Sequence, residues 1–296
     1  MKKLIYLLLA MPLLFASCNK DADVAGEETV QVTFCAELPQ LITTRATTLN
    51  VDKVACAVFE NNTEIIGLRT YIDISAGQSI LFSPRLIKGR SYKVVFWAYK
   101  YGCYDVDDMT AITRNSGWSE ADYDAFTATI ATNGVTGVEQ PIGVTLQRPF
   151  AQLNVGITQE DWDAVTNIFH MTPTTTTISL TGKSTFNALS GAAVGTDSQI
   201  TYTLPEVSGA DLVVISTTYK NIATCFVLPE DGQENFNITY SVSDQNGSVI
   251  RTNTIDSVPF EANHKTNLVG SLLTGIVTYN VEITGAFDDS EHNEEI

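Results

Sequence analysis

Alternation of apolar and polar residues is the dominant pattern along this chain. It is clearest over residues 29–38. The apolar face of that segment carries Val30, Val32, Phe34, Ala36 and Leu38. A period of two with one apolar face is typical of a half-buried β-strand. Residues 91–101 are apolar on both faces, which indicates a strand in the middle of a packed sheet.

The second half of the chain repeats this pattern. Residues 236–242 alternate, and Asn246-Gly247 then leads into residues 249–255, an arrangement typical of a β-hairpin. Two short helices are expected at residues 119–126 and 158–169, because each segment begins with a capping sequence. The remaining expected strands are 51–60, 80–82, 143–146, 151–157, 176–180, 200–204, 211–217, 222–228 and 279–283.

Many short strands separated by turn residues are typical of β-sandwiches and barrels. The two-faced strand favours sandwiches, and the length of the chain suits two of them better than one. The sequence therefore predicts an all-β protein with two tandem β-sandwich domains and one or two short helices. The expected divisions are a signal peptide at 1–17, a lipidated flexible tether at 18–28, an N-terminal β-sandwich at 29–157, a C-terminal β-sandwich at 158–287 and an acidic tail at 288–296.

The first residues have the pattern of an export signal. Two lysines precede an apolar run over residues 4–16, as in a secretory signal peptide. That run is shorter than the roughly 20 residues that a bilayer-spanning helix needs. It ends in Ala16-Ser17-Cys18, which resembles a lipobox, so we expect cleavage before Cys18 and lipidation of its thiol. An ordinary signal peptide followed by a chance cysteine is the alternative.

Lipid on Cys18 predicts a protein anchored in the outer membrane and displayed at the cell surface. A single acyl chain holds a protein only weakly, whereas two or three anchor it firmly. Residues 19–23 resemble the acidic surface-export signal of lipoproteins in Gram-negative gut and oral anaerobes. A plain solvated tether explains this stretch equally well.

The acidity of the chain limits its partners. The formal net charge is −17, and loss of Lys2 and Lys3 with the signal peptide makes it −19. There is no basic stripe, which argues against nucleic acid as a partner. An acidic surface also gains nothing from anionic lipid, so the acyl group must do the anchoring.

The cysteines give no sign of a metal site. Besides Cys18 the chain has Cys35, Cys56, Cys103 and Cys225, widely spaced and without a CxxC pair. A zinc site needs close ligand pairs, so no metal is expected. Buried free thiols are the simpler interpretation. A disulfide is the alternative in an oxidising compartment, and the sequence does not choose its partners.

No catalytic motif stands out in the sequence. It contains no GxSxG, HExxH, P-loop or GxGxxG pattern, so we expect neither an enzyme nor a cofactor. Trp118 beside Tyr123 is the better candidate for an exposed aromatic platform that stacks on a sugar, whereas Trp97 lies in the densest apolar strand and is assigned to the core. A monomeric glycan-binding surface lipoprotein is therefore an alternative function.

Three further segments carry a family resemblance. Residues 263–275, followed by the strand 279–283, resemble the C-terminal signature of the fimbrillin, or Mfa-like, superfamily, the subunits of type V pili. Residues 146–155 resemble its mid-chain R-x-x-A strand, and residues 185–191 resemble a segment of its second domain. The resemblance spans nearly the whole chain and implies two transthyretin-like β-sandwiches.

The resemblance also implies an assembly mechanism. In many fimbrillins an Arg-specific protease cuts after the first strand, and a strand from the next subunit fills the groove that opens. Here Arg45-Ala46 follows the strand 29–38, so a cut there would remove this strand together with the lipid. Strand addition supplies backbone hydrogen bonds, and alternate side chains fill pockets. An uncut subunit with Arg45 in an ordinary loop is the alternative.

Together these features predict an exported surface lipoprotein that acts as a fimbrial (pilus) structural subunit or tip adhesin. Its expected partners are other fimbrial subunits through donor-strand addition, the outer membrane through Cys18, and a host or bacterial surface ligand. The expected donor is the final strand, at residues 278–283. The sequence does not distinguish a shaft, tip or anchor role.

Overall fold

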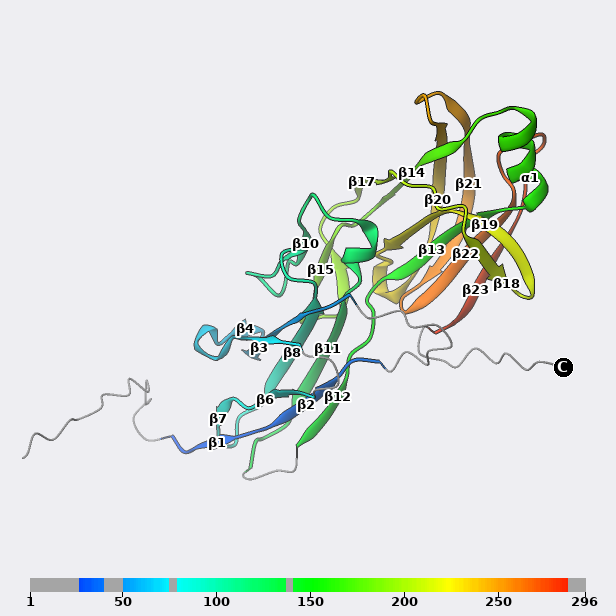
Figure 1. Ribbon diagram of the computed structural model, residues 1–296. Helices are drawn as coiled ribbons and strands as arrows, with labels where there is room; N and C mark the ends of the chain where they lie inside the picture. Colours follow the sequence, from blue (N-terminus) through cyan, green and yellow to red (C-terminus); the bar gives the residue numbers. More distant parts are fainter. Residues whose placement is uncertain (1–26, 40–49, 75–78, 137–140, 287–296) are drawn as a thin grey trace, which may run out of the picture.

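Two β-rich halves lie end to end in an elongated molecule (Figure 1). The first half carries the strands up to residue 145, and the second half carries the strands from residue 151 onward. The structure is a computed structural model that describes residues 27–39, 50–74, 79–136 and 141–286. Strands predominate in both halves, so the predicted all-β sandwich fold is confirmed. Among these described residues, no helix is long and apolar enough to cross a membrane.

The larger sheet of the first half has the path β11-β8-β3-β4, with β5 also paired to β3. Strands β3 and β8 are both buried on their two faces. For β8 the two-faced apolar pattern of residues 91–101 predicts this. The bounds are β3 Lys53–Glu60, β4 Thr63–Glu64, β5 Thr70–Asp73, β8 Tyr92–Tyr99 and β11 Phe126–Thr132. One face of this sheet covers a core with the smaller sheet of the first half, and the other face meets the second half.

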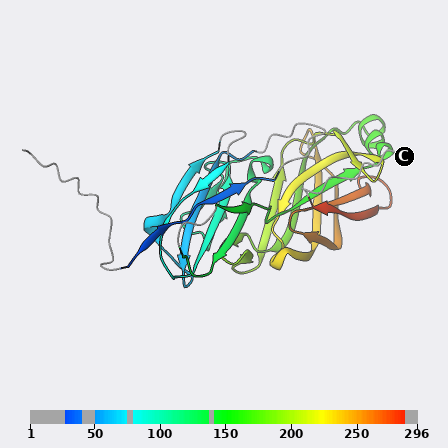
Figure 2. The ribbon, with the colours of Figure 1, turned by 90° about the horizontal axis from the view of Figure 1, so that it is seen from below.

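The smaller sheet of the first half has the order β12-β2-β6, and β1 pairs with β7 beside it. The predicted strand at residues 29–38 is therefore two strands, separated by Val32 and Thr33, although its side chains alternate as expected. In Figure 2 the blue N-terminal strands run along one face of the first half. The bounds are β1 Thr29–Gln31, β2 Phe34–Glu37, β6 Ile80–Phe82, β7 Arg85–Ile87 and β12 Ile142–Thr145.

The second half packs a sheet of order β18-β19-β13-β22-β23 against a sheet of order β17-β14-β20-β21. The first of these sheets comprises β13 Ala151–Ile157, β18 Asp211–Val214, β19 Thr217–Val227, β22 His264–Ser271 and β23 Thr278–Ala286. The second comprises β14 Pro173–Gly182, β17 Ser198–Leu204, β20 Gln233–Asp244 and β21 Val249–Glu261. The hairpin predicted at Asn246-Gly247 joins β20 to β21.

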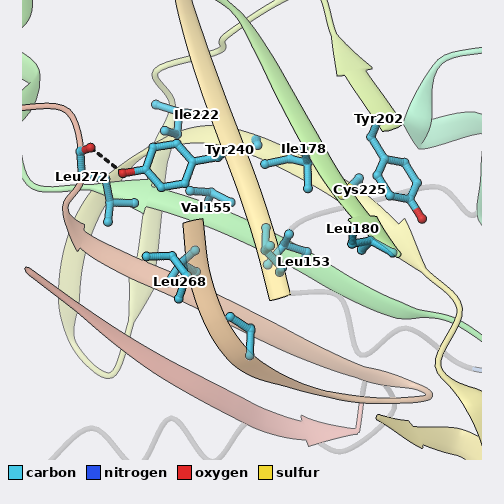
Figure 3. Close-up of a cluster of buried hydrophobic side chains, with 14 of the residues drawn as sticks. Leu153, Val155, Ile178, Leu180, Tyr202, Ile222, Cys225, Tyr240, Leu268 and Leu272 are labelled. Atoms are coloured by element: carbon cyan, nitrogen blue, oxygen red, sulfur yellow. Dashed lines mark hydrogen bonds between the residues drawn. The ribbon is translucent and has the colours of Figure 1, made fainter. Parts of the chain in front are cut away.

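The core of the second half contains a buried tyrosine whose hydroxyl is satisfied. Tyr240 donates to the carbonyl of Leu272 at 2.6 Å, in the turn between β22 and β23 (Figure 3). Between β13 and β22, the side-chain amide of Asn154 donates to the side-chain oxygen of Asn267 at 2.8 Å. Buried polar groups need such partners. The segment 263–275 is therefore a packing and turn element of this half.

Short elements complete the chain. The predicted helix at residues 158–169 is present as α1 Gln159–Asp163 and a π-helical turn Ala164–Ile168. The segment predicted as helical at 119–126 contains only a 3-10 turn, Glu120–Tyr123. The other elements are the 3-10 turns Ile66–Leu68 and Glu230–Gly232 and the strand pairs β9 Tyr104–Asp105 with β10 Thr113–Arg114 and β15 Thr185–Asn187 with β16 Ala192–Val194.

One predicted strand belongs to the other half. The sequence places residues 151–157 in the N-terminal sandwich, but this assignment is wrong. Strand β13 pairs antiparallel with β19 and parallel with β22, and its inward side chains lie in the second core. Hydrophobic periodicity identifies a strand without naming its partners. A division into two domains remains a prediction, and its boundary must precede β13.

Candidate functional site

Strand β2 occupies the middle of the sheet β12-β2-β6. It runs parallel to β12 and antiparallel to β6, so both of its edges are hydrogen-bonded. Backbone bonds extend this pairing beyond the strand, since Val32 N–H donates to Pro84 at 3.1 Å and Leu146 N–H donates to Glu37 at 3.0 Å. The first described strands of the chain are therefore inserted between elements that come later in the sequence.

The inward side chains of this segment fill the first core. Val32 is 1% exposed, and Phe34 and Ala36 are fully buried. The ring of Phe34 lies 6.3 Å from that of Phe82 and 6.2 Å from that of Phe96, between centroids. Full burial of a valine or phenylalanine side chain contributes roughly 1.5–3 kcal/mol each. Apolar contacts therefore contribute most of the free energy that keeps this segment in the sheet.

Ion pairs at the start of the segment add little. Lys88 pairs with Glu28 at 2.9 Å, and Arg90 pairs with Glu27 at 2.6 Å, but these side chains are substantially solvent-exposed. Exposed pairs of this kind contribute little to stability, because solvent screens them. The segment is held by its alternating apolar face and its backbone pairing.

Removal of β2 would leave a groove. The facing edges of β6 and β12 would lose their hydrogen-bond partners along a row of backbone groups. The groove floor would expose Phe82 and Phe96, which now contact Phe34. An edge of this kind accepts another strand. The strand that filled it would need apolar residues at alternate positions.

Strand β23 is a different kind of strand. It lies at the edge of its sheet and pairs only with β22. None of its residues is buried. Tyr279, Val281 and Ile283 alternate with polar residues, as do the apolar residues of the β2 segment. The sequence predicts that this strand is the donor in strand addition to another subunit.

A family comparison covers most of the chain. The model of one family matches residues 23–296. This chain belongs to the family of unknown function DUF6562. No curated protein matches it.

Solved structures similar to this DUF6562 chain include fimbrial proteins. One neighbour, from Bacteroides thetaiotaomicron, is a proposed polysaccharide-binding protein (DUF1812), with 12% identity, 87% and 100% coverage of the two chains and a TM-score of 0.49. A fimbrial assembly protein from Parabacteroides distasonis has 12% identity, 87% and 99% coverage and a TM-score of 0.45. The tip fimbrial protein Mfa3 from Porphyromonas gingivalis has 13% identity, 87% and 99% coverage and a TM-score of 0.43.

These neighbours include fimbrial proteins of the Mfa type, as the sequence resemblance anticipates. At such identities and TM-scores they support no argument about what the DUF6562 chain binds or assembles with.

The predicted lipidation and processing residues of this DUF6562 chain are Cys18, Arg45 and Ala46, and all three lie outside the described residues. Their roles remain predictions. In the sequence, the described segment 27–39 comes directly before the stretch that holds Arg45. A cut at that residue would separate β1 and β2 from the rest of the chain.

Trp118 and Tyr123 do not form a shared exposed platform. Trp118 is 38% exposed and packs on Gly102, where an added Cβ would meet the indole at 3.0 Å, while Lys100 lies 5.3 Å from its ring centroid. Tyr123 is only 6% exposed and donates its hydroxyl to Asn115 at 2.6 Å. Of these two rings in the DUF6562 chain, Trp118 is therefore the one that is exposed enough to stack on a glycan. Such stacking remains a prediction.

The four described cysteines are free thiols. Cys35 lies on the outward side of β2 and is half-buried, and the other three are buried. Burial raises the pKa of Cys56 to about 12 and that of Cys103 to about 11. The thiolate is the reactive form, so these two thiols are unreactive near neutral pH. No group of three or more metal-ligating side chains occurs among the described residues.

Sequence reasoning missed one buried pair at the R-x-x-A motif. Arg148 donates two hydrogen bonds to Asp124, at 2.7 and 2.9 Å, and its guanidinium lies 4.4 Å from the ring centroid of Phe126. Both charged residues are at least nine-tenths buried. The arginine of the motif therefore fixes the chain where it leaves the first half. The sequence shows Arg148 directly before a proline, but it does not show that Asp124, 24 residues earlier, is its partner.

Proposed function

We propose that this chain is an exported surface lipoprotein that acts as a fimbrial structural subunit or tip adhesin. Lipid on Cys18 anchors the new subunit in the outer membrane. Cleavage between Arg45 and Ala46 then cuts the covalent link to the first strands, and a strand from another subunit displaces them together with their lipid. The protein thus works at the cell surface and in the fimbrium, with other fimbrial subunits as partners.

The central position of β2 supports this proposal. A strand at a sheet edge leaves behind one unpaired edge, but β2 is paired on both sides and contributes fully buried Phe34 and Ala36. Its loss would create a groove lined by two strand edges with an apolar floor. Such a groove is stable only when another strand fills it.

Cleavage alone would not empty the groove. The β2 segment is held by its own backbone bonds and apolar contacts, so a cut releases it only when a competing strand displaces it. Strand β23 of a second copy is the proposed competitor, because it lies at a sheet edge and has no fully buried residue. Its residues Tyr279, Val281 and Ile283 would then occupy the positions of Val32, Phe34 and Ala36.

Replacement of the cleavage residue tests the proposal. We expect surface protein from wild-type cells to start at Ala46 and to form polymers, whereas an Arg45→Ala variant starts at lipidated Cys18 and stays monomeric. Arg251→Ala, at a partly exposed position of β21 in the second half, is the matched control and should behave as wild type. N-terminal sequencing and electrophoresis without boiling give both readouts. Equal assembly of the two arginine variants would refute the processing step.

Glycan binding is the second candidate function, and the half-exposed ring of Trp118 is the observation that favours it. A monomeric glycan-binding lipoprotein would give signals on a glycan array that fall when Trp118 is replaced by alanine. Phe169, which is 56% exposed on the second half, provides the control substitution to alanine. Silence across a broad array would count against this candidate.

A further inference from the structure

A pocket of about 140 Å³ lies where the two halves meet. Trp97 and Arg114 line it from the first half, and Lys183, Phe186 and Tyr202 line it from the second. Tyr202 stands at the end of the second core, and its hydroxyl points away from the other labelled side chains (Figure 3). A cavity of about 150 Å³ can admit benzene. This pocket therefore has room for one six-membered ring.

Aromatic side chains form much of the pocket wall. The ring centroid of Trp97 lies 5.3 Å from that of Tyr104, 5.4 Å from that of Phe186 and 6.2 Å from that of Phe150. All four residues line the pocket. Aromatic faces and edges pack well against another ring. The shape and the wall chemistry both favour a ligand with a cyclic body.

The charged residues of the wall are both cations. Arg114 and Lys183 line the pocket, and no acidic side chain is among its described lining residues. Arg114 donates to the carbonyl of Phe226 at 2.8 Å and to the carboxylate of Glu120 at 3.3 Å. A guanidinium has five N–H donors and binds a carboxylate in a bidentate geometry. These two bonds leave part of its donor capacity for an anion. Lys183 is already paired with the carboxylate of Glu230, so it contributes less to anion binding than Arg114 does.

A further hydrogen-bond donor of the wall lacks an acceptor. Trp97 is fully buried, and its indole Nε1–H has no hydrogen-bond partner among the residues that the structure describes. An unsatisfied buried donor costs about 1–3 kcal/mol. Such a group in a native protein calls for an explanation.

We propose that this junction pocket binds a small organic acid, a carboxylate carried on a six-membered ring. The carboxylate pairs with Arg114 and Lys183, and the ring packs against the aromatic wall. Because both halves line the pocket, the bound acid also ties the halves together. The proposed strand exchange at β2 plays no part in this inference.

Calorimetric titration of the full chain tests this proposal with two acids and their neutral counterparts. Benzoate is compared with benzamide, and glucuronate with glucose, so that an aromatic acid is distinguished from a sugar acid. We expect at least one acid to bind at least tenfold more tightly than its neutral counterpart. Arg114→Gln should weaken acid binding at least tenfold, and Lys183→Gln about threefold.

Arg85→Gln, which lies outside the pocket lining, is the matched control and should leave the affinity unchanged. The melting temperature of each variant shows whether it folds, and Lys183→Gln serves as the test if Arg114→Gln unfolds. Equal binding of acid and neutral counterpart, absence of binding by both acids, or wild-type affinity in a folded Arg114→Gln or Lys183→Gln variant would overturn the proposal.

Discussion

Strands β2 and β23 have the same alternating sequence pattern but opposite surroundings. Strand β2 is four residues long, is paired on both sides and has inward side chains that are fully buried. Strand β23 is nine residues long, is paired on one side and has no buried residue. Strand β2 therefore completes the first core, whereas β23 lies beside the second core.

This difference indicates that the first core depends on β2, whereas the second core does not depend on β23. The first core loses two sheet edges and part of its apolar filling when β2 leaves. The second core keeps its sandwich when β23 leaves, because β22 is also paired with β13. A fold with one indispensable strand and one dispensable strand of the same pattern is suited to strand exchange between copies.

The largest expected effect is at the buried ring of β2. Phe34→Ala should lower the free energy of unfolding by about 3–5 kcal/mol, because it leaves a cavity beside Phe82 and Phe96. Urea unfolding of the full chain measures this loss. A loss below 1 kcal/mol would show that β2 does not complete the core, and the contrast with β23 would fail.

A smaller effect is expected at the turn that leads into β23. The buried carboxylate of Asp161 accepts hydrogen bonds from the backbone N–H groups of Leu272 and Leu273, each at 2.7 Å, and of Thr274 at 2.8 Å. Asp161→Asn replaces an acceptor with a donor and should cost about 1.5–3 kcal/mol. Amide hydrogen exchange across 271–286 should accelerate.

Asp163→Asn is the matched control for this turn. Asp163 is exposed. Among the described residues its carboxylate accepts hydrogen bonds from the side chains of Gln159 at 3.0 Å and Asn167 at 3.2 Å. Its replacement should change the stability by less than about 0.5 kcal/mol. If both variants exchange alike over 271–286, Asp161 does not hold the turn.

A side-chain truncation in β23 should have less effect than Phe34→Ala or Asp161→Asn. Val281 is only half-buried against the second core, so Val281→Ala should cost about 1 kcal/mol. The same urea titration as for Phe34→Ala gives a direct comparison. A cost equal to that of Phe34→Ala would mean that β23 is as tightly packed as β2.

The smallest expected effect concerns reactivity, and it leaves stability unchanged. Near neutral pH, Cys35 should react with iodoacetamide before the other described thiols, because it is half-buried while they are buried. The raised pKa of Cys56, about 12, keeps that thiol protonated until the solution is strongly alkaline. Peptide mass spectrometry after timed labelling measures the order. Faster labelling of Cys56 would contradict the packing of the first core.

Local sequence patterns predicted the features of the fold that depend on neighbouring residues. The pleat of a strand imposes a period of two, so the buried face at Val32, Phe34 and Ala36 could be read directly. The Asn246-Gly247 turn likewise fixed a hairpin between adjacent strands. The two-faced strand at residues 91–101 was recognised because no polar face interrupts it.

Features that depend on distant partners could not be read in the same way. The pairing of β13 with β22 joins segments more than a hundred residues apart, and no periodicity specifies it. Asp161 was identified only as part of a helix start, and its bonds to residues 272–274 come from the tertiary fold. The pocket at Arg114 is built from both halves, so its lining residues are scattered along the sequence.

A removable disulfide across β2 and β6 tests the central claim most directly. Cys35 and Leu81 are register partners with outward-facing side chains. Paired residues in antiparallel strands have Cα atoms about 4.5–5.5 Å apart, which suits a disulfide. A Leu81→Cys variant should therefore oxidise and lock β2 in place.

The measurement is polymer formation after Arg-specific cleavage of this variant, with and without reductant. We predict that the oxidised protein stays monomeric, because β2 remains in the groove although the chain is cut. Reductant should restore assembly to the wild-type level. Equal assembly of the oxidised and reduced forms, with the disulfide verified by mass spectrometry, would contradict strand exchange at β2.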